Sequence, residues 1–250
     1  MTTKGMSIKK LIALFITVFL LITVFTVPVG LIVKQFNLPK NVSYDSLQGT
    51  LWQGSIKAAQ YKKTVLTQVQ WQWLPWQLFK GKVAFKLRWG NARVSQQLSG
   101  TAVASVGFSG YQLNDTTVRL PASAVKPLLP FPMGDLYGRV IADINSYSFG
   151  EPLCSELNGE LVWTKAGVDI NGVIDFGVIS SALSCDNNQV LATFDGQNSL
   201  GLQGLAKLES QTSFSFDGFL KPDASLPAVV HQGIGMFGKA DSQGRFKISL

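Results

Sequence analysis

A run of apolar residues from Leu11 to Val33 contains no charged side chain, and it constrains the fold of this chain more than any other feature. About 23 residues at about 1.5 Å each give a helix of about 34 Å, enough to cross a hydrocarbon core of about 30 Å. Pro28 and Gly30 lie near the far end, where a kink does little harm. We therefore predict a transmembrane anchor over residues 11–33. The residues assigned to this anchor include Leu11, Phe15, Phe19, Ile22, Phe25 and Val33.

The charges around this run predict its orientation. Lys4, Lys9 and Lys10 precede it, and the first acidic residue is Asp45. The positive-inside bias then keeps residues 1–10 in the cytoplasm and sends residues 34–250 across the membrane. A cleaved signal peptide is the alternative. We favour an uncleaved anchor, because the run is longer than a usual signal-peptide core and no A-x-A-like site follows it.

The net charge argues against a nucleic-acid partner. Of the formal charge of +7, Lys4, Lys9 and Lys10 contribute three, which leaves +4 for residues 34–250. That part of the chain is long enough for one large β domain or two small ones. A charge of this size, without a basic cluster interleaved with aromatic residues, is typical of a mildly basic protein surface.

The two cysteines, Cys154 and Cys185, both follow the predicted anchor. In an oxidising compartment, two thiols about 31 residues apart are most simply explained as one disulfide bond. Two free buried thiols are the alternative. The sequence has no C-x-x-C motif, so it supports neither a thioredoxin-like redox site nor a zinc cluster.

Beyond the anchor, apolar and polar residues alternate in short runs. This period of two is typical of strands with one buried and one solvated face. One later run predicts a buried face shared by Val168, Ile170, Ile174, Phe176 and Val178. Glycine and Asn/Asp turn signals recur, often about every ten residues. We therefore predict a curved, mostly antiparallel β meander after a single transmembrane helix.

Three segments that break this alternation predict short helical turns at the ends of the sheet: Leu74–Phe79, Pro121–Leu129 and Leu226–Phe237. A weak echo between Leu47–Trp52 and Leu157–Trp163 leaves open a duplicated β unit. In that case the domain would divide near residue 130, where prolines are dense.

No catalytic constellation is visible in the sequence. The single histidine, His231, excludes a multi-histidine metal site, and no G-x-S-x-G motif accompanies it. We therefore expect no catalytic residues, no metal site and no cofactor.

The tryptophans provide a candidate contact site. Their clustering predicts part of a β core, an aromatic belt resting on the outer membrane leaflet, or an apolar groove for a lipid or a partner segment. The candidate cluster consists of Trp52, Trp71, Trp73, Trp76 and Trp89.

Four motifs carry a resemblance to a known family. They are GTLWQGS at Gly49–Ser55, QWQWLPWQLFKGKV at Gln70–Val83, TVRLPASAVKPLLP at Thr117–Pro130, and a final RFKISL. With the short basic stub and the anchor, they resemble protein N of the bacterial type II secretion system over nearly the whole chain. The G-x-L-W and W-x-x-x-x-L-x-x-G patterns are also distantly similar to β-groove proteins of the Gram-negative envelope that handle lipids. The resemblance implies an inner-membrane protein with a periplasmic domain, and it implies no catalytic residues.

We therefore expect a non-enzymatic accessory component of type II secretion, in the cell inner membrane, that assists export of folded proteins across the outer membrane. Its expected partners are other secretion subunits and the membrane, contacted in part through a sheet edge formed by the run that ends at Leu250. The alternative is a periplasmic lipid-binding or lipid-transfer groove, which requires an open, apolar concave face. A periplasmic enzyme is the third hypothesis.

Overall fold

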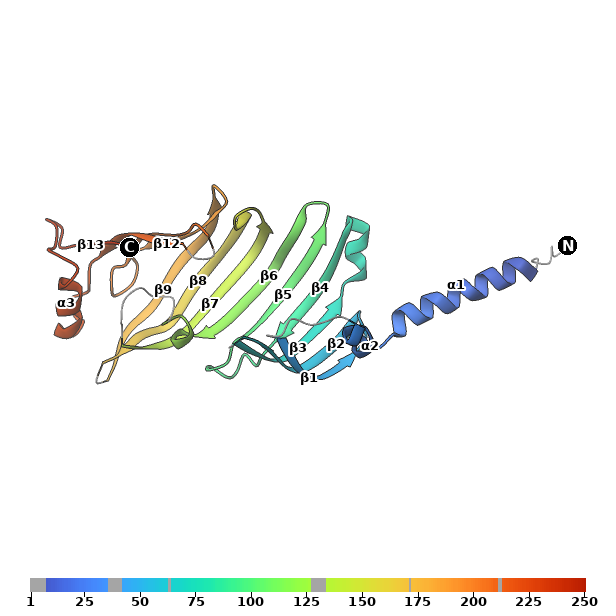
Figure 1. The fold of residues 1–250 in the computed structure, drawn as a ribbon. Helices are drawn as coiled ribbons and strands as arrows, with labels where there is room; N and C mark the ends of the chain where they lie inside the picture. The colour runs from blue at the N-terminus through green and yellow to red at the C-terminus, as the bar shows by residue number, and fades with distance from the viewer. Residues whose placement is uncertain (1–7, 36–41, 63, 127–133, 171, 211–212) are drawn as a thin grey trace, which may run out of the picture. The chain divides into compact units, whose positions relative to one another are not determined.

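The computed structural model describes residues 8–35, 42–62, 64–126, 134–170, 172–210 and 213–250. They belong to two compact units, Met1–Trp73 and Leu74–Leu250, called below the N-terminal and the C-terminal unit (Figure 1). Both contain antiparallel strands, as predicted, and the C-terminal unit consists largely of them. The expected division near residue 130 falls within residues 127–133, which lie outside the described residues.

The N-terminal unit combines two helices with a three-stranded meander. Strand β1 pairs antiparallel with β2, and β2 pairs antiparallel with β3. Helix α1 is apolar and unburied, and its 19 residues make it the one helix in the described part of the chain that is long and apolar enough to cross a membrane. The elements are α1 (Ile8–Thr26), α2 (Val29–Gln35), β1 (Val42–Gly49), β2 (Gln53–Tyr61) and β3 (Thr64–Trp73).

The long helix does not follow the boundaries of the apolar run. It begins at Ile8 and ends at Thr26, and Val33 lies half-buried in the separate helix α2. Pro28 explains the break, because it has no N–H to continue the helix and disfavours helical backbone at the preceding residue. The other residues assigned to the anchor are exposed on α1, and these are Leu11, Phe15, Phe19, Ile22 and Phe25.

The C-terminal unit is a long meander with three short helical segments, each of which overlaps one of the three predicted segments. Residues 127–129 of the second predicted segment lie outside the described residues. Its elements are η1 (Pro75–Lys80), β4 (Lys82–Trp89), β5 (Ser99–Gly107), β6 (Gly110–Pro121), η2 (Ala122–Ala124), β7 (Asp135–Phe149), β8 (Cys154–Asp169), β9 (Val173–Asp186), β10 (Gln189–Asp195), β11 (Gln203–Leu208), β12 (Phe214–Leu220), α3 (Ala228–Gly235) and β13 (Phe246–Ser249).

Each strand from β4 to β13 pairs antiparallel with the next strand in the sequence. Successive connections therefore alternate between the two rows of strand ends, one on each side of the sheet. One row of strand ends, the upper one in Figure 1, carries η1 and the β5–β6, β7–β8 and β9–β10 turns. We call this row of strand ends the η1 edge; it is distinct from the edge strand β13.

The predicted alternation fails in β9 at Gly177. Phe176 and Ile179 are both buried, although an undisturbed strand would place them on opposite faces. Gly177 has a positive φ of 77°, and the pairing of β8 with β9 changes register beside it, which marks a β-bulge. The bulge leaves Val178 exposed, and Ile170 is exposed beyond the end of β8. The prediction that these two residues share the buried face was wrong.

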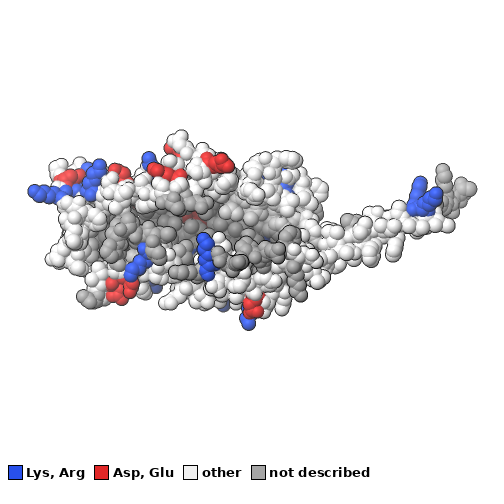
Figure 2. All heavy atoms as spheres, viewed as in Figure 1, with Lys and Arg blue, Asp and Glu red and all other residues white. Residues whose placement is uncertain are grey.

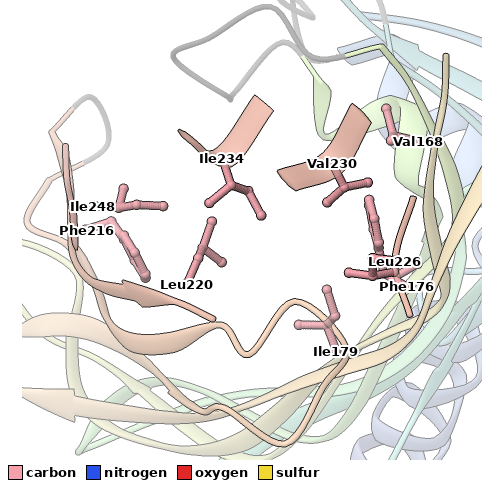
Figure 3. Packing of buried hydrophobic residues seen from close by; sticks show 10 residues of the cluster. Val168, Phe176, Ile179, Phe216, Leu220, Leu226, Val230, Ile234 and Ile248 are labelled. Carbon is pink, nitrogen blue, oxygen red and sulfur yellow. The ribbon is translucent and has the colours of Figure 1, made fainter. Parts of the chain in front are cut away.

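The main core of the C-terminal unit lies between the curved sheet and α3 (Figure 3). Ile234 of α3 points toward Leu220 and Ile248 of the last two strands. Val230, four residues earlier on the same face of α3, lies nearer Leu226 and Phe176. Burial of each such side chain contributes about 1.5–3 kcal/mol. Helix α3 therefore covers the concave face at this end of the sheet.

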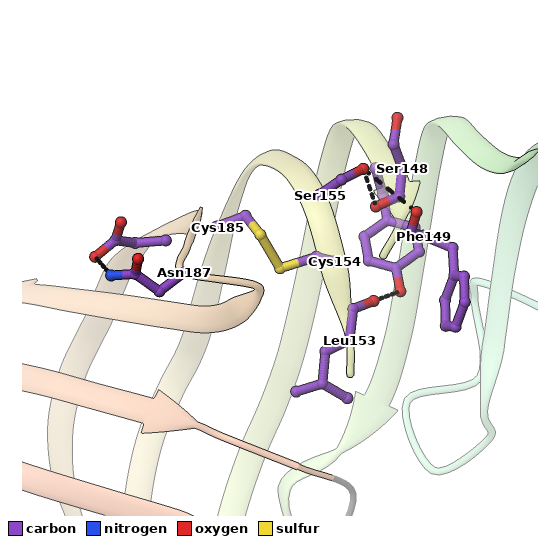
Figure 4. Close-up of a disulfide and its surroundings, with 9 residues drawn as sticks. Ser148, Phe149, Leu153, Cys154, Ser155, Cys185 and Asn187 are labelled. Carbon is purple, nitrogen blue, oxygen red and sulfur yellow. Dashed lines mark hydrogen bonds between the residues drawn. A yellow bond between two sulfur atoms is a disulfide. The ribbon is translucent and has the colours of Figure 1, made fainter. Parts of the chain in front are cut away.

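A disulfide bond joins Cys154, the first residue of β8, to Cys185 near the end of β9 (Figure 4). Cys154 lies beyond the last β8–β9 pair, Asn158 with Ser184, and its N–H donates instead to the carbonyl oxygen of Asn188. Nearby, burial raises the pKa of Tyr147. The disulfide thus joins β8 to β9 beyond the point where the β8–β9 ladder ends, while Cys154 pairs with Phe149 of β7 and Cys185 pairs with Val190 of β10.

Removal of this bond should destabilise the C-terminal unit. Closing a loop of about 31 residues stabilises the fold by about 3.5 kcal/mol. We expect Cys154→Ser to lower the thermal unfolding midpoint by on the order of 10 °C, measured by scanning fluorimetry of the full chain in detergent. Cys154→Ser combined with Cys185→Ser is the control and should cause no further loss. An unchanged midpoint, or native thiols that label without denaturant, would contradict the role of the bond.

Candidate functional site

The five tryptophans predicted to form one cluster divide between the two units. Trp52, Trp71 and Trp73 belong to the N-terminal unit, whereas Trp76 and Trp89 belong to the C-terminal unit. Each group is therefore described within its own unit.

Two of these indoles pack on glycines of the neighbouring strand. Trp71 lies directly across from Gly54, and Trp89 lies directly across from Gly100. A Cβ atom on Gly54 would come within 2.3 Å of the Trp71 ring, and one on Gly100 within 2.4 Å of the Trp89 ring. A large ring opposite a glycine covers the backbone where the glycine has no side chain. Trp71 and Trp89 therefore fit the interpretation as part of the β structure.

Trp52 and Trp73 form an aromatic junction with Phe25, near the end of α1. The ring centroids lie 4.5 Å apart for Trp52 and Trp73, 5.0 Å for Phe25 and Trp52, and 6.0 Å for Phe25 and Trp73. Trp52 lies in the β1–β2 turn, and its carbonyl accepts a hydrogen bond from the N–H of Trp73. Rings at these distances attract one another beyond simple area burial, by about 0.5–1.5 kcal/mol per pair.

A hydrogen bond from Trp52 completes this junction. The Val24 carbonyl would normally accept from the N–H of residue 28, but residue 28 is a proline and has none. The indole Nε1–H of Trp52 donates to the Val24 carbonyl oxygen instead, at 3.0 Å. Pro28 also forms an isolated antiparallel bridge with Thr50. The meander of the N-terminal unit therefore caps the end of the apolar helix. The residue that caps it is a tryptophan, a residue type that is enriched at membrane–water interfaces.

Sequence reasoning found the tryptophans of this junction but not Phe25, which was assigned to the anchor. The available signal was Pro28, because a proline four residues after Val24 leaves that carbonyl without its helical partner. Nothing in the sequence pattern tells which donor replaces it, since Trp52 is distant along the chain.

The residues considered for catalysis show no supporting arrangement in the described parts of the chain. His231 lies half-buried in α3, and no group of three or more potential metal ligands is present among the described residues. The pKa of Asp223 is lowered mainly by hydrogen bonds from Ser225, with a small contribution from the charge of His231. These features are typical of a turn that leads into a helix.

Comparison with known proteins identifies relatives over nearly the full chain. The family model described as "Type II secretion system (T2SS), protein N" matches residues 40–249. Type II secretion system protein N of Aeromonas hydrophila is 33% identical over 245 residues, which cover 94% of each chain. The protein of the same name from Vibrio cholerae is 27% identical over 237 residues and 93% of each chain. That of Klebsiella pneumoniae is 25% identical over 207 residues, 79% of this chain and 77% of the relative. No solved structure gives a significant match.

Loss of the Trp52 N–H should loosen the N-terminal unit. Trp52→Phe keeps an aromatic ring but leaves the Val24 carbonyl without its donor, at a cost of about 1–3 kcal/mol. We expect the free energy of opening of β1 and β2 to fall by this amount, measured by amide hydrogen exchange of the full chain in detergent.

Two further variants make this test specific. Trp76→Phe removes an indole N–H from an exposed ring and should leave exchange in β1 and β2 unchanged. In a Pro28→Ala background, residue 28 regains an N–H, so the additional effect of Trp52→Phe should shrink. Equal exchange in Trp52→Phe and the wild type would show that the hydrogen bond does not hold the junction.

Proposed function

This chain belongs to the type II secretion system protein N family, and on that premise we propose that it is a non-enzymatic accessory component of the secretion apparatus. It is held in the cell inner membrane by the apolar helix, with residues 1–10 in the cytoplasm and the β structure in the periplasm. It assists export of folded proteins across the outer membrane by docking on other secretion subunits. Lys4, Lys9 and Lys10, which precede the uncharged run that starts at Leu11, support this orientation, and the disulfide supports an oxidising compartment.

The observation that carries this proposal is the outer side of β13. On its inner side, Leu250 and Phe216 exchange two backbone hydrogen bonds, of 2.9 and 3.1 Å. In an antiparallel ladder such pairs alternate, so Ile248 also faces β12, whereas Lys247 and Ser249 direct their N–H and C=O groups away from it. Within the described residues, no strand pairs with that outer side.

An unpaired edge of this kind can accept a strand from another protein. The side chains of β13 define what would fit, because Ile248 is buried beside the core while Lys247 is exposed. A strand added next to β13 would continue the apolar face toward the core and would favour acidic side chains on the Lys247 face. We therefore propose that the partner subunit contributes an extended segment that alternates apolar and acidic residues.

Hydrogen bonds order the turn that leads into β13, so this strand is held ready for pairing. The Asp241 carboxylate accepts hydrogen bonds from the N–H groups of Gln243 and Arg245, at 2.8 and 2.9 Å, and pairs with the Arg245 guanidinium. These contacts, led by the Arg245 N–H, hold the pKa of Asp241 below its usual range. The turn is therefore held in place at neutral pH, and its contribution is lost only as the pH falls through this lowered pKa.

The lipid-groove hypothesis instead requires an open, apolar concave face in the C-terminal unit. On the concave face, Ile234 of α3 already packs near Leu220 and Ile248, and Val230 packs near Leu226, so an acyl chain there must displace α3. We therefore propose docking as the function and treat a bound lipid as the result that would replace it.

The test is purification from the native membrane with variants that separate the backbone from the side chain. Lys247→Pro removes an N–H that β12 does not use, so the fold should persist. Loss of one interface hydrogen bond, with its partner left unpaired, costs about 1–3 kcal/mol. We expect Lys247→Pro to reduce the recovered secretion subunits about tenfold, measured by mass spectrometry of proteins and lipids.

Lys247→Ala is the matched control, because it keeps the N–H while it removes the charge. It should retain most of the subunits, and both variants should keep the wild-type unfolding midpoint. Equal recovery with Lys247→Pro and Lys247→Ala would exclude strand pairing at this edge. A stoichiometric lipid without any secretion subunit would favour the groove function instead.

A further inference from the structure

A protruding group of aromatic side chains occupies one end of the η1 edge of the C-terminal unit. Trp76 and Phe79 of η1 are 75% and 85% exposed, and Phe108 in the β5–β6 turn is fully exposed. Soluble surfaces rarely leave such large apolar side chains together in water. We call this group the aromatic tip, and it consists of Trp76, Leu78, Phe79, Phe108 and Tyr111.

The backbone holds the aromatic tip together. Gly81 ends η1 with a φ of 69°, and its N–H donates to the Leu78 carbonyl oxygen at 2.9 Å. A Cβ atom on Gly81 would lie 3.3 Å from the Phe108 ring, so the β5–β6 turn packs directly against the end of η1. The rings of Trp76 and Phe79 stack with centroids 6.1 Å apart. The tip is therefore a preformed surface of two turns.

The charges around the aromatic tip are of one sign. Lys80 and Lys82 are the only charged residues in segments 74–83 and 104–112, which form η1, β4 up to Val83 and the β5–β6 turn. The surface over η1 and this turn is almost uncharged in Figure 2, whereas acidic atoms gather over the adjoining turns of the same edge. Glu151 lies in the β7–β8 turn, and Asp186 ends β9. Carboxylates therefore limit the tip to η1 and the β5–β6 turn.

We infer that the aromatic tip inserts into a leaflet of the membrane that α1 spans and contacts anionic phospholipid there. Trp, Tyr, Phe and Leu side chains with nearby lysines form the usual composition of segments that rest in the headgroup region. Nearly full exposure favours lipid over protein, because a fluid leaflet conforms to protruding side chains, whereas a protein needs a matching pocket for each. Lys80 supplies the attraction to phosphate, and the carboxylates of the adjoining turns are kept out of the leaflet by charge.

Chain connectivity favours this leaflet over any other. Leu74 alone separates Trp73 of the aromatic junction from Pro75, the first residue of η1. Two residue steps span at most about 7 Å, so η1 is tethered to the residue that packs against the end of α1. Because the tip is tethered to a chain that α1 anchors, its effective concentration at the surface of that leaflet is raised.

The test is photocrosslinking of the purified full chain in nanodiscs that contain phosphatidylethanolamine and phosphatidylglycerol, with no other protein. Phe79 or Phe108 is replaced by p-benzoylphenylalanine, which is tolerated because both side chains are exposed. Tyr137→p-benzoylphenylalanine is the control, since Tyr137 is 48% exposed near the start of β7, at the opposite edge of the same unit. We expect phospholipid adducts at residues 79 and 108, detected by intact mass, and none above background at residue 137.

Charge provides a second readout. Lys80→Gln, combined with p-benzoylphenylalanine at residue 108, should lower the adduct yield about fivefold at low ionic strength. Replacement of all lipid by phosphatidylcholine should lower it similarly. Adducts at residues 79 and 108 no more abundant than at residue 137, or crosslinks between two copies of the chain in their place, would overturn the inference. Because no other subunit is present, this result is independent of docking at β13.

Discussion

Backbone pairing between strands adjacent in sequence is the constraint on which the β structure of this protein depends. In the C-terminal unit every strand from β4 to β13 finds its partner next to it in the chain, so the sheet needs no crossover connection. Within the part of the chain that the structure describes, β13 pairs on one side only, with β12. The buried core does not close that side, because it lies on the concave face between the sheet and α3. The same constraint that builds the fold thus supplies the edge at which we place the docking surface.

In the N-terminal unit, the main feature is the way in which the end of the apolar helix α1 is capped. Pro28 stops α1 and removes the partner of the Val24 carbonyl, and Trp52 supplies the missing donor from the β1–β2 turn. The rings of Phe25 and Trp73 pack around this bond. Because the β1–β2 turn contacts the end of α1 directly, the orientation of the helix fixes that of the strands that follow. A flexible linker without such contacts would not do so. The arrangement suits a component whose β structure must stay at a membrane surface.

The class of fold could be predicted from the sequence, and so could the approximate positions of the helical segments that interrupt the strands. Alternation with a period of two, recurring turn residues and three short interruptions predicted an antiparallel meander with helical segments, and the cysteine pair predicted the disulfide. The pattern could not locate the bulge at Gly177, because a glycine within a strand is compatible with either register. It therefore misplaced Val178. The local pattern also does not distinguish the tryptophans from one another: Trp71 and Trp89 cover glycines, whereas Trp76 is exposed beside Phe79. Contacts between residues distant along the chain, such as Trp52 with Val24, have no local signal at all.

The central claim is that a secretion partner adds a strand to the outer side of β13, and hydrogen exchange of individual amides tests it most directly. The amides of Lys247 and Ser249 should exchange rapidly in the purified chain, because their N–H groups point away from β12, while that of Ile248 is protected. In the complex recovered from the native membrane, the account predicts that Lys247 and Ser249 become protected as well. Amides that stay equally fast in the chain and in the complex would contradict it.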